Sequence, residues 1–169
     1  MRTERVVLLA LGSNLGARAE TLGGALHLMQ EAMLRNVTRS SLYATEPVGG
    51  PPQDWYVNQV VRAETGMSAH ALLGECLAVE RHFGRERSVR NAPRTLDVDV
   101  LDYDGLVLDD DRLTLPHPRL HERRFVLVPL AEIAPAWRHP RLGKTAAELL
   151  NECADVSQVK RLASEPPAR

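Results

Sequence analysis

The stretch Ala92-Pro93-Arg94-Thr95-Leu96-Asp97-Val98-Asp99-Val100-Leu101 decides how this chain can fold and what it can bind. Apolar side chains alternate with polar ones along this stretch, which predicts a β-strand with one buried face. Because residues two apart on a strand point the same way, Asp97 and Asp99 share the opposite face. Their Cα atoms should lie roughly 7 Å apart, from a rise of about 3.3 Å per residue.

Two carboxylates at that spacing repel each other unless a cation lies between them. Oxygen ligands suit Mg²⁺, which proteins commonly bind through one or two carboxylates together with substrate phosphates. Pro93 cannot take part in a central ladder and marks the start of the strand, where Arg94 can bind phosphate oxygens as a planar fork. The alternative is a strand whose solvent face carries two aspartates by chance, although Asp is depleted in strands.

Length and composition point to one soluble globular domain, since the chain has 169 residues, 44% hydrophobic and 25% charged. We expect a single domain over 1–160, a disordered tail over 161–169, and a monomer. The formal net charge of −1 gives no field that favours nucleic acid or an anionic membrane. No apolar run approaches the length of about 18 residues that a membrane helix needs. Cys76 and Cys153 fit free thiols in a reducing cytoplasm, where we expect the protein to reside.

Periodicity along the chain predicts elements in the order β-α-β-β-α-β-β-α-α. The predicted strands are 5–11, 36–45, 55–65, 95–101 and 106–108, the last returning from a turn at Asp104-Gly105. The predicted helices are 18–34, 69–82, 119–133 and 145–153. This is the α+β class. The order resembles the ferredoxin-like β-α-β-β-α-β plan, with an added hairpin strand and C-terminal helices.

A loop with four arginines, at positions 85, 87, 90 and 94, leads directly into the two carboxylates. A basic loop is ordinarily just solvated. Arginines beside Mg²⁺, however, are what a polyphosphate transfer site requires, because charge must be stabilised on the phosphoryl oxygens. A long polar loop can also close over a substrate. By contrast, Gly143-Lys144-Thr145 is not a P-loop, because position 138 is Arg where that motif requires Gly.

Two further groups of residues are candidates for binding. His117 lies between two prolines, with Arg112 and Thr114 upstream and Arg123 downstream, which suggests a second anion-contacting segment. Taken alone, a histidine in a loop is more often structural.

Tyr56 and Asn58 should share a strand face, and an amide buried there needs hydrogen-bond partners. A flat heteroaromatic ligand would provide both those bonds and a stacking surface for Tyr56 and Phe125, although an aromatic side chain belongs to the core by default.

Residues 90–101 resemble the signature of the 6-hydroxymethyl-7,8-dihydropterin pyrophosphokinase family, which acts in folate biosynthesis. The likeness extends over nearly the whole chain. The other matching segments are 11–16, 43–49, 56–58, 112–118 and 123–125. Each segment is modest by itself, but the set in this order is highly specific.

The resemblance implies an enzyme that transfers a pyrophosphoryl group from ATP to the hydroxymethyl oxygen of the pterin and releases AMP. Asp97 and Asp99 match the family's ligands for two Mg²⁺ ions. The implied ATP contacts are Glu80, Arg85, Arg87, Arg94, Arg112, Thr114, His117 and Arg123, with Arg85 and Arg94 also catalytic. The implied pterin pocket is Thr45, Pro47, Val48, Tyr56, Asn58 and Phe125, with Tyr56 and Phe125 on either side of the ring.

Three departures from the family pattern concern loop closure and some of the ATP contacts. Many members carry Trp where Asn91 stands, some have a segment one residue longer between Arg87 and Arg94, and a tyrosine often replaces Pro118. Two other functions compete. An RNA-binding module would need exposed aromatics and a basic face, which the 4% aromatic content and the net charge oppose. A nucleotidyltransferase would release pyrophosphate instead of AMP.

Overall fold

The centre of the molecule is a six-stranded sheet, seen in a computed structural model that describes residues 3–50, 52–84 and 95–163. The strands are β1 (Arg5–Ser13), β2 (Arg35–Arg39), β3 (Tyr43–Thr45), β4 (Tyr56–Thr65), β5 (Asp97–Tyr103) and β8 (Val159–Arg161). They are hydrogen-bonded in the order β5-β1-β4-β3-β8, and β2 pairs with β4 next to β3. Every pairing is antiparallel.

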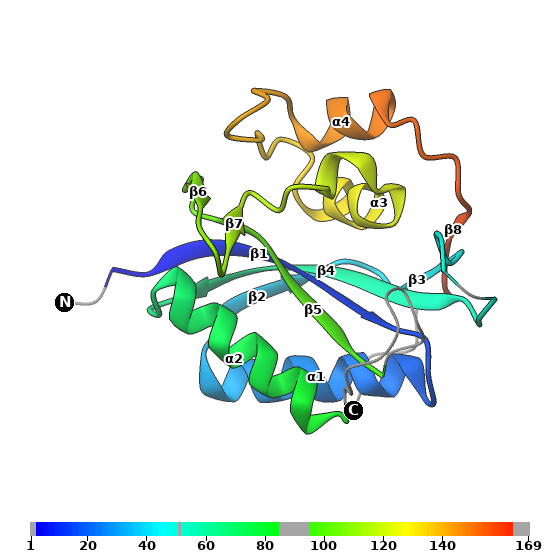
Figure 1. The fold of residues 1–169 in the computed structure, drawn as a ribbon, viewed down its shortest axis with the longest axis horizontal. Helices are drawn as coiled ribbons and strands as arrows, with labels where there is room; N and C mark the ends of the chain where they lie inside the picture. Colours follow the sequence, from blue (N-terminus) through cyan, green and yellow to red (C-terminus); the bar gives the residue numbers. More distant parts are fainter. Residues whose placement is uncertain (1–2, 51, 85–94, 164–169) are drawn as a thin grey trace.

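Helices cover the sheet on both faces (Figure 1). α1 (Arg18–Ala32) and α2 (Ala69–His82) lie on one face, and α3 (Arg124–Ile133) and α4 (Ala146–Glu152) lie on the other. A short 3₁₀ helix, η1 (Leu120–Glu122), precedes α3. Within the described part of the chain, no helix is long and apolar enough to cross a membrane.

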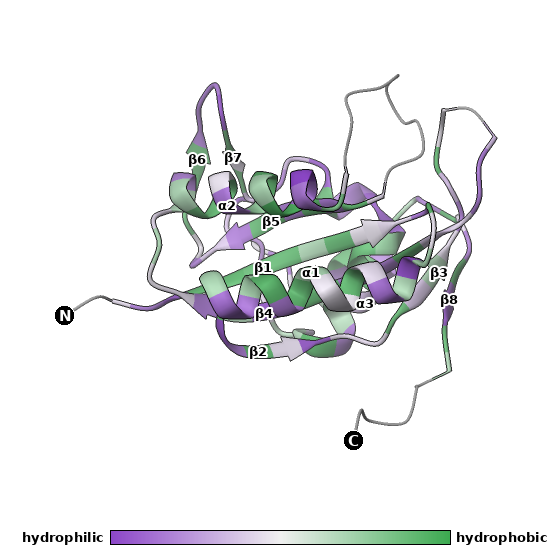
Figure 2. Cartoon of the chain, turned by 90° about the horizontal axis from the view of Figure 1, so that it is seen from below, coloured by the Kyte–Doolittle hydropathy of each residue, from purple (hydrophilic) through white to green (hydrophobic). Residues whose placement is uncertain are grey.

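The hydrophobic residues of β1 are buried on both faces of the sheet. Val7, Leu9 and Leu11 belong to the core under α1 and α2, whereas Leu8 belongs to a second core under α3 and α4. A strand buried on both sides needs a continuous apolar run instead of an alternating one, which explains the sequence from Val6 to Leu11. Figure 2 shows β1 as hydrophobic along most of its length.

A bulge changes the direction of the side chains near the end of β5. Leu9 is paired with Val100 and Leu8 with Asp102, so Leu101 is the extra residue of the bulge. Asp102 therefore turns toward the second core, where its Oδ2 accepts a hydrogen bond of 3.2 Å from Trp137 Nε1. The bulged carbonyl of Leu101 accepts a bond of 2.8 Å from the His117 backbone N–H.

The predictions for β1, β4, α2, α4 and the α+β class are confirmed, apart from small differences at the element ends. α2 has the predicted bounds because its ends are chemically marked. Ser68 Oγ accepts from the Ala71 N–H at 3.2 Å, and Gly84 has a φ of +79° just past the helix. The ferredoxin-like plan and the single domain over 1–160 stay predictions.

The predicted strand 36–45 is wrong as one element, because it divides into β2 and β3 at Ser40. There the Val60 N–H donates to the Ser40 side-chain oxygen at 3.0 Å, and the Ser40 carbonyl accepts from Gln59 Nε2 at 2.8 Å. Side-chain groups thus take two positions of the ladder, and the strand is interrupted.

The predicted hairpin strand 106–108 is also wrong. Leu108 begins β6 (Leu108–Asp109), which pairs with β7 (Thr114–Leu115) in a separate two-stranded sheet. Backbone groups along the outer edge of β5 already have hydrogen-bond partners. The Val98 N–H donates to the Glu80 carboxylate, and the Leu101 carbonyl accepts from the His117 backbone N–H. A returning strand would find those backbone groups occupied.

The predicted helix 119–133 is interrupted at Arg123, whose φ of −115° and ψ of 104° are extended. η1 ends before this residue and α3 begins after it. β8 has no counterpart in the predictions, and its last residue, Arg161, is the first residue of the predicted tail. Residues 164–169 lie outside the described part of the chain.

Candidate active site

The two carboxylates of β5 lie on the sheet face that carries α3. Val98 and Val100 are each 4% exposed and belong to the core under α1 and α2. Asp97 and Asp99 alternate with them, are half-buried, and point to the other face. The predicted alternation is therefore confirmed.

Strand register places polar residues of three strands in one row across that face. Gly12 of β1 is paired with Asp97 on one side and with Asn58 of β4 on the other, and Asn58 is paired in turn with Tyr43 of β3. Neighbouring strands lie about 4.8 Å apart, so Asn58 and Asp97 belong to backbones roughly 10 Å apart. The predicted metal-binding and pterin-binding strands thus meet at one end of the sheet.

Gly12 leaves room for the side-chain amide of Asn58. A Cβ at position 12 would come within 2.4 Å of Asn58 Oδ1 and 3.7 Å of Tyr56 Cδ1. Distances under about 3 Å between such atoms require one of them to move. A side chain at position 12 would therefore displace the Asn58 amide from its present position, which was not predicted from the sequence.

Asn58 has a hydrogen-bond partner within the protein. Its Nδ2 donates to Thr45 Oγ1 at 2.5 Å, and both residues are buried, at 9% and 1% exposure. The bond fixes the orientation of the amide, so that Oδ1 lies over Gly12. A ligand is therefore needed for only part of the hydrogen-bonding capacity of this amide.

The start of α3 brings a cation and an aromatic ring to the same end of the sheet. The Arg123 guanidinium carbon lies 5.7 Å from the centre of the Phe125 ring, a cation–π distance. Burial lowers the pKa of Arg123, while the charges of Asp99 and, more weakly, Asp97 oppose that shift. Arg123 stays a cation at neutral pH and lies near enough to the carboxylates to interact with both.

His117 is held beside Asp99 by its backbone. Its N–H donates to the Leu101 carbonyl, and its Nδ1 accepts a hydrogen bond of 3.2 Å from the Arg119 N–H. Burial lowers the pKa of His117, and Arg123 and Arg119 add to this effect, while Asp99 opposes it. A neutral ring that accepts at Nδ1 carries its proton on Nε2, so His117 can offer one N–H donor to an anion.

Other predicted site residues are bound elsewhere or lie at the rim. The Glu80 carboxylate is 2% exposed and accepts from the Val98 N–H at 2.8 Å. Thr114 Oγ1 donates to Asp109 at 3.2 Å. Arg112 is exposed. Val48 is 56% exposed and follows Pro47 in the loop between β3 and β4.

The predicted residues Arg85, Arg87 and Arg94, like Asn91, lie outside the described residues.

Asn14 and Arg18 support the site but were absent from the predictions. Asn14 is 2% exposed, and its Nδ2 donates to Gln53 Oε1 at 2.5 Å and to the Asp54 carbonyl at 3.3 Å. Arg18 donates to the Trp55 carbonyl. Together they hold the loop that leads into Tyr56. The signal for Asn14 in the sequence was a polar residue directly after a central strand, whereas Arg18 is the first residue of α1 and carried no such signal.

The donor set fits a metal ion that takes part of its ligands from a substrate. Among the described ranges 3–50, 52–84 and 95–163, no three or more His, Cys, Asp or Glu side chains form a complete metal site. Asp97 and Asp99 provide carboxylate oxygens only. Mg²⁺ is commonly bound by one or two carboxylates, with phosphates and water completing its shell.

Comparison with known proteins decides the family. The family model described as 7,8-dihydro-6-hydroxymethylpterin-pyrophosphokinase (HPPK) matches residues 8–135. The chain belongs to the HPPK family. The resemblance stated from the sequence and the predicted enzyme class, a pyrophosphokinase, are thereby confirmed.

Two curated HPPK relatives are similar over most of their length. The chain is 49% identical over 128 residues to the 2-amino-4-hydroxy-6-hydroxymethyldihydropteridine pyrophosphokinase of Methylorubrum extorquens, covering 75% of this chain and 81% of that one. It is 40% identical over 153 residues to the protein of the same name from Haemophilus influenzae, covering 90% and 95%.

A solved structure has the same fold. The crystal structure of Plasmodium falciparum HPPK-DHPS A437G with SDX-DHP superposes with a TM-score of 0.73 at 14% identity, covering 90% of this chain and 46% of that one. This chain therefore spans less than half of that solved chain, and the likeness concerns the fold alone.

Proposed function

We propose that this HPPK-family chain transfers a pyrophosphoryl group from ATP to the hydroxymethyl oxygen of 6-hydroxymethyl-7,8-dihydropterin, releases AMP, and so serves folate biosynthesis. The observation that carries the proposal is the cross-strand row of Asn58, Gly12 and Asp97. It brings a fixed amide within two strand spacings of a pair of carboxylates on one face. An acceptor alcohol and a polyphosphate would meet between them.

The pterin would bind on the Asn58 side of the row. Because Asn58 Nδ2 is already bound to Thr45, its Oδ1 is oriented to accept from a donor on the pterin edge. Tyr56 and Phe125 would stack on the two faces of the ring, and Pro47 and Val48 would line the rim. Aromatic stacking contributes about 0.5–1.5 kcal/mol beyond the area buried, and the amide would select rings with a matching edge.

ATP would bind on the carboxylate side. Asp97 and Asp99 would hold two Mg²⁺ ions, which when bound neutralise triphosphate charge and ease deprotonation of the hydroxyl. Arg123 would contact the phosphates as a cation, and His117 would donate from Nε2. The further proposed ATP contacts are Glu80, Arg85, Arg87, Arg94, Arg112 and Thr114. For Glu80 this requires that one carboxylate serve both the ribose and the Val98 N–H.

Positioning and charge stabilisation are sufficient for this chemistry, because phosphoryl transfer leaves little covalent work to the protein. In this proposal the described residues near Asp99 bind and orient the two substrates, and His117 serves as a hydrogen-bond donor, because its Nδ1 already accepts from the Arg119 N–H. We also propose a ferredoxin-like core made of β1, α1, β2 with β3, β4, α2 and β5, which the observed strand order supports. A monomer and a cytoplasmic location stay predictions.

The decisive experiment identifies the products formed from ATP. Purified protein with Mg²⁺ and the hydroxymethyl-dihydropterin should yield AMP and the pyrophosphorylated pterin, as separated by chromatography. The control without pterin should leave ATP unchanged. ADP as the main product would contradict the proposal, and release of pyrophosphate would favour a nucleotidyltransferase.

A further inference from the structure

The C-terminal segment Asp155–Arg161 contacts α3, β3 and the loop between β3 and β4, all of which contribute residues to the proposed pterin pocket. We call this segment the strap. It lies beyond residues 8–135, which the family model matches. Figure 1 shows it leaving α4 and descending beside the sheet to end in β8 next to β3. It makes hydrogen bonds to α3 and β3, an ion pair to α3, and a cation–π contact to the loop before β4.

The first contact is at the start of α3, where Asp155 acts as the helix cap. Arg123, in the N-cap position, makes no side-chain cap bond of its own. Instead the Arg124 N–H donates to Asp155 Oδ2 at 3.0 Å, and Asp155 Oδ1 accepts from the Ser157 N–H at 2.9 Å. A carboxylate at this place satisfies a backbone donor and interacts favourably with the helix dipole. The capped turn carries Arg123 and Phe125.

The electrostatics of Asp155 agree with this role. Burial alone would raise the pKa of Asp155, but the hydrogen bonds from Ser157 and Arg124 outweigh burial and lower it. The carboxylate is therefore ionised at neutral pH and remains an acceptor for both N–H groups.

The second contact is with β3 and the loop after it. β8 pairs with β3, with Val159 opposite Thr45. One residue further, the Glu46 N–H donates to the Gln158 carbonyl at 3.0 Å, and the Gln158 N–H donates to Glu46 Oε2 at 2.9 Å. These bonds fix the chain directly before Pro47, at the rim of the proposed pocket.

The strap also reaches the loop that leads into β4. The Lys160 ammonium lies 5.4 Å from the centre of the Trp55 ring, a cation–π contact. Trp55 directly precedes Tyr56, so the strap touches the loop on the stacking side of the proposed pocket.

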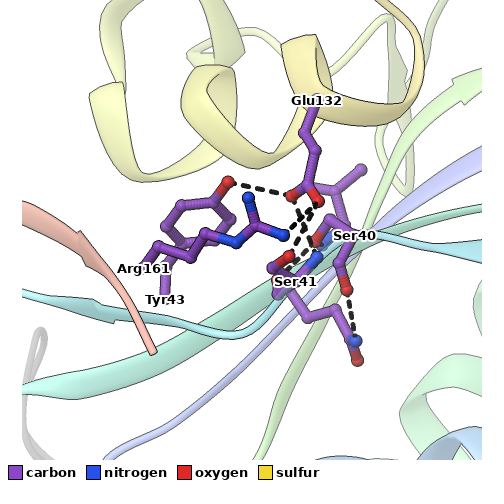
Figure 3. A network of polar contacts seen from close by, with 7 residues as sticks. Ser40, Ser41, Tyr43, Glu132 and Arg161 are labelled. Atoms are coloured by element: carbon purple, nitrogen blue, oxygen red, sulfur yellow. Dashed lines mark hydrogen bonds and ion pairs between the residues drawn. The ribbon is translucent and has the colours of Figure 1, made fainter. Parts of the chain in front are cut away.

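A fourth contact joins the C-terminal end of α3 to the sheet (Figure 3). The Glu132 carboxylate of α3 accepts from Tyr43 Oη at 2.8 Å and from Ser41 Oγ at 2.8 Å. Arg161 of the strap lies 3.8 Å from the same carboxylate. Burial raises the pKa of Tyr43 to about 12, and Glu132 adds to this effect. The phenol therefore stays a donor.

Close packing does not hold the strap along its first half. A cavity of about 710 Å³ lies against it and is lined by Arg124, Cys153, Asp155 and Ser157, among others, and Val156 is 91% exposed. Because few apolar contacts fix this part, its position depends on a small number of hydrogen bonds. Loss of one such bond should therefore change the position of the first turn of α3.

From these contacts we infer that the strap sets the separation of α3 from β3 and β4, and that Asp155 is a positioning residue for the pterin pocket. The inference rests on the proposed function, because it assigns Phe125 to one wall of that pocket and Tyr56 and Asn58 to the other. Asp155 itself touches neither substrate. It acts by holding the first turn of α3 in place.

The test compares the loss of two helix caps. α3 carries Phe125 of the proposed pocket, whereas α4 carries none of the proposed site residues. Asp155→Ala removes the cap of α3, whereas Thr145→Ala removes the cap of α4, where Thr145 Oγ1 accepts from the Glu148 N–H at 3.2 Å. Both variants should lose a similar amount of thermal stability, about 2–4 °C in Tm. Only Asp155→Ala should weaken pterin binding, by about fivefold, the equivalent of about 1 kcal/mol.

The measurement is calorimetric titration of the pterin into enzyme preloaded with Mg²⁺ and a non-hydrolysable ATP analogue. Hydrogen exchange at the Arg124 N–H should become faster in Asp155→Ala and stay unchanged in Thr145→Ala. Asp155→Asn, which keeps one acceptor oxygen, should lie between wild type and Asp155→Ala, and it serves as the test variant if Asp155→Ala does not fold.

Equal pterin affinity in wild type and in the folded Asp155 variants would overturn the positioning role, even if Tm falls. An equal loss of affinity in Thr145→Ala would overturn it as well, because the effect would then be general destabilisation. If the wild-type protein binds no pterin while its Arg124 N–H is protected, the proposed function fails, and the role of the strap in pterin binding fails with it.

Discussion

The two faces of the central sheet are built from the same strands but differ in composition, because one is mostly core and the other carries the proposed site. Under α1 and α2, the side chains of β1, β4 and β5 are mostly apolar, as with Leu9, Val61 and Val98, and the buried Gln59 of β4 is a polar exception. Under α3 and α4, the face is apolar at one end only, where Leu8 and Val60 pack against the helices. At its other end the strands present the polar row that contains Asn58 and Asp97.

This difference shows how stability and chemistry are separated within single strands. One step along β5 leads from Val98, which is buried in the first core, to Asp99, which lies in the proposed site. α3 begins only at Arg124, so its first turn borders the polar end of the face instead of covering it. A substitution should therefore affect stability or activity according to the face on which it lies.

The largest effect is expected from the carboxylates of β5. Asp97→Ala and Asp99→Ala should each lower turnover by at least about 10²-fold, the scale of losing one electrostatic stabiliser. Their folding should survive, because removal of one carboxylate relieves repulsion. Val98→Ala, between them, should instead cost about 2 kcal/mol of unfolding free energy with nearly normal turnover. Steady-state kinetics and urea unfolding of the three variants measure both quantities, and near-normal turnover in either folded Asp variant would refute the metal assignment.

The next largest effect, a loss of pterin affinity, is expected from Gly12→Ala, with Gly23→Ala as its control. Gly12→Ala should force Asn58 away from Thr45, because the new Cβ would lie 2.4 Å from Asn58 Oδ1. Overpacking of this kind costs roughly 1–3 kcal/mol, and pterin affinity should fall while binding of the ATP analogue stays unchanged. Gly23→Ala in α1 meets no atom within 4 Å and should stabilise by about 0.5–1 kcal/mol. Thermal unfolding and calorimetry compare the two; unaltered pterin binding in Gly12→Ala would argue against the Asn58 pocket.

The smallest effect is expected on the pH dependence of the unfolding free energy, and it concerns His139, which lies between α3 and α4 in the sequence. His139 is 4% exposed, and its Nδ1 accepts from the Arg141 and Leu142 N–H groups, both at 3.1 Å. Burial lowers the pKa of His139, and the nearby charges of His121 and Arg141 lower it further. The pKa of a histidine in the unfolded chain is about 6.5. Near and below that pH, position 139 therefore binds more protons in the unfolded chain than in the folded protein.

Stability from His139 should accordingly be present at pH 7.5 and decline as the pH falls through about 6.5. His139→Asn keeps an acceptor for the two N–H groups but does not titrate, so its unfolding free energy should fall less between pH 7.5 and 5.5. His27, which is exposed on α1, supplies the control variant His27→Asn. If His139→Asn follows the wild-type pH profile, the histidine is not the group responsible.

Local patterns were enough to predict the parts of the site that lie within one element. The alternation from Leu96 to Val100 predicted the shared face of Asp97 and Asp99, and the same reasoning placed Tyr56 and Asn58 together. The register that pairs Asn58 and Asp97 with Gly12 was not predictable in this way, because it depends on strands far apart in the chain. The Asp155 cap of α3 comes from 31 positions away in sequence and carries no local signal.

The sequence by itself determined the helix from Ala69 to His82, the buried run of β1, the paired carboxylates and the family resemblance, because each depends on periodicity or on adjacent residues. The tertiary structure alone decided the break at Ser40, the bulge at Leu101, the extended residue Arg123 and the pairing of β8 with β3. At Ser40 and at Leu101 a hydrogen bond from a distant segment, from Val60 and from His117 respectively, replaces the bond that local propensity would favour. Long-range polar contacts of this kind form only when the cores on both sides of the sheet have brought the segments together.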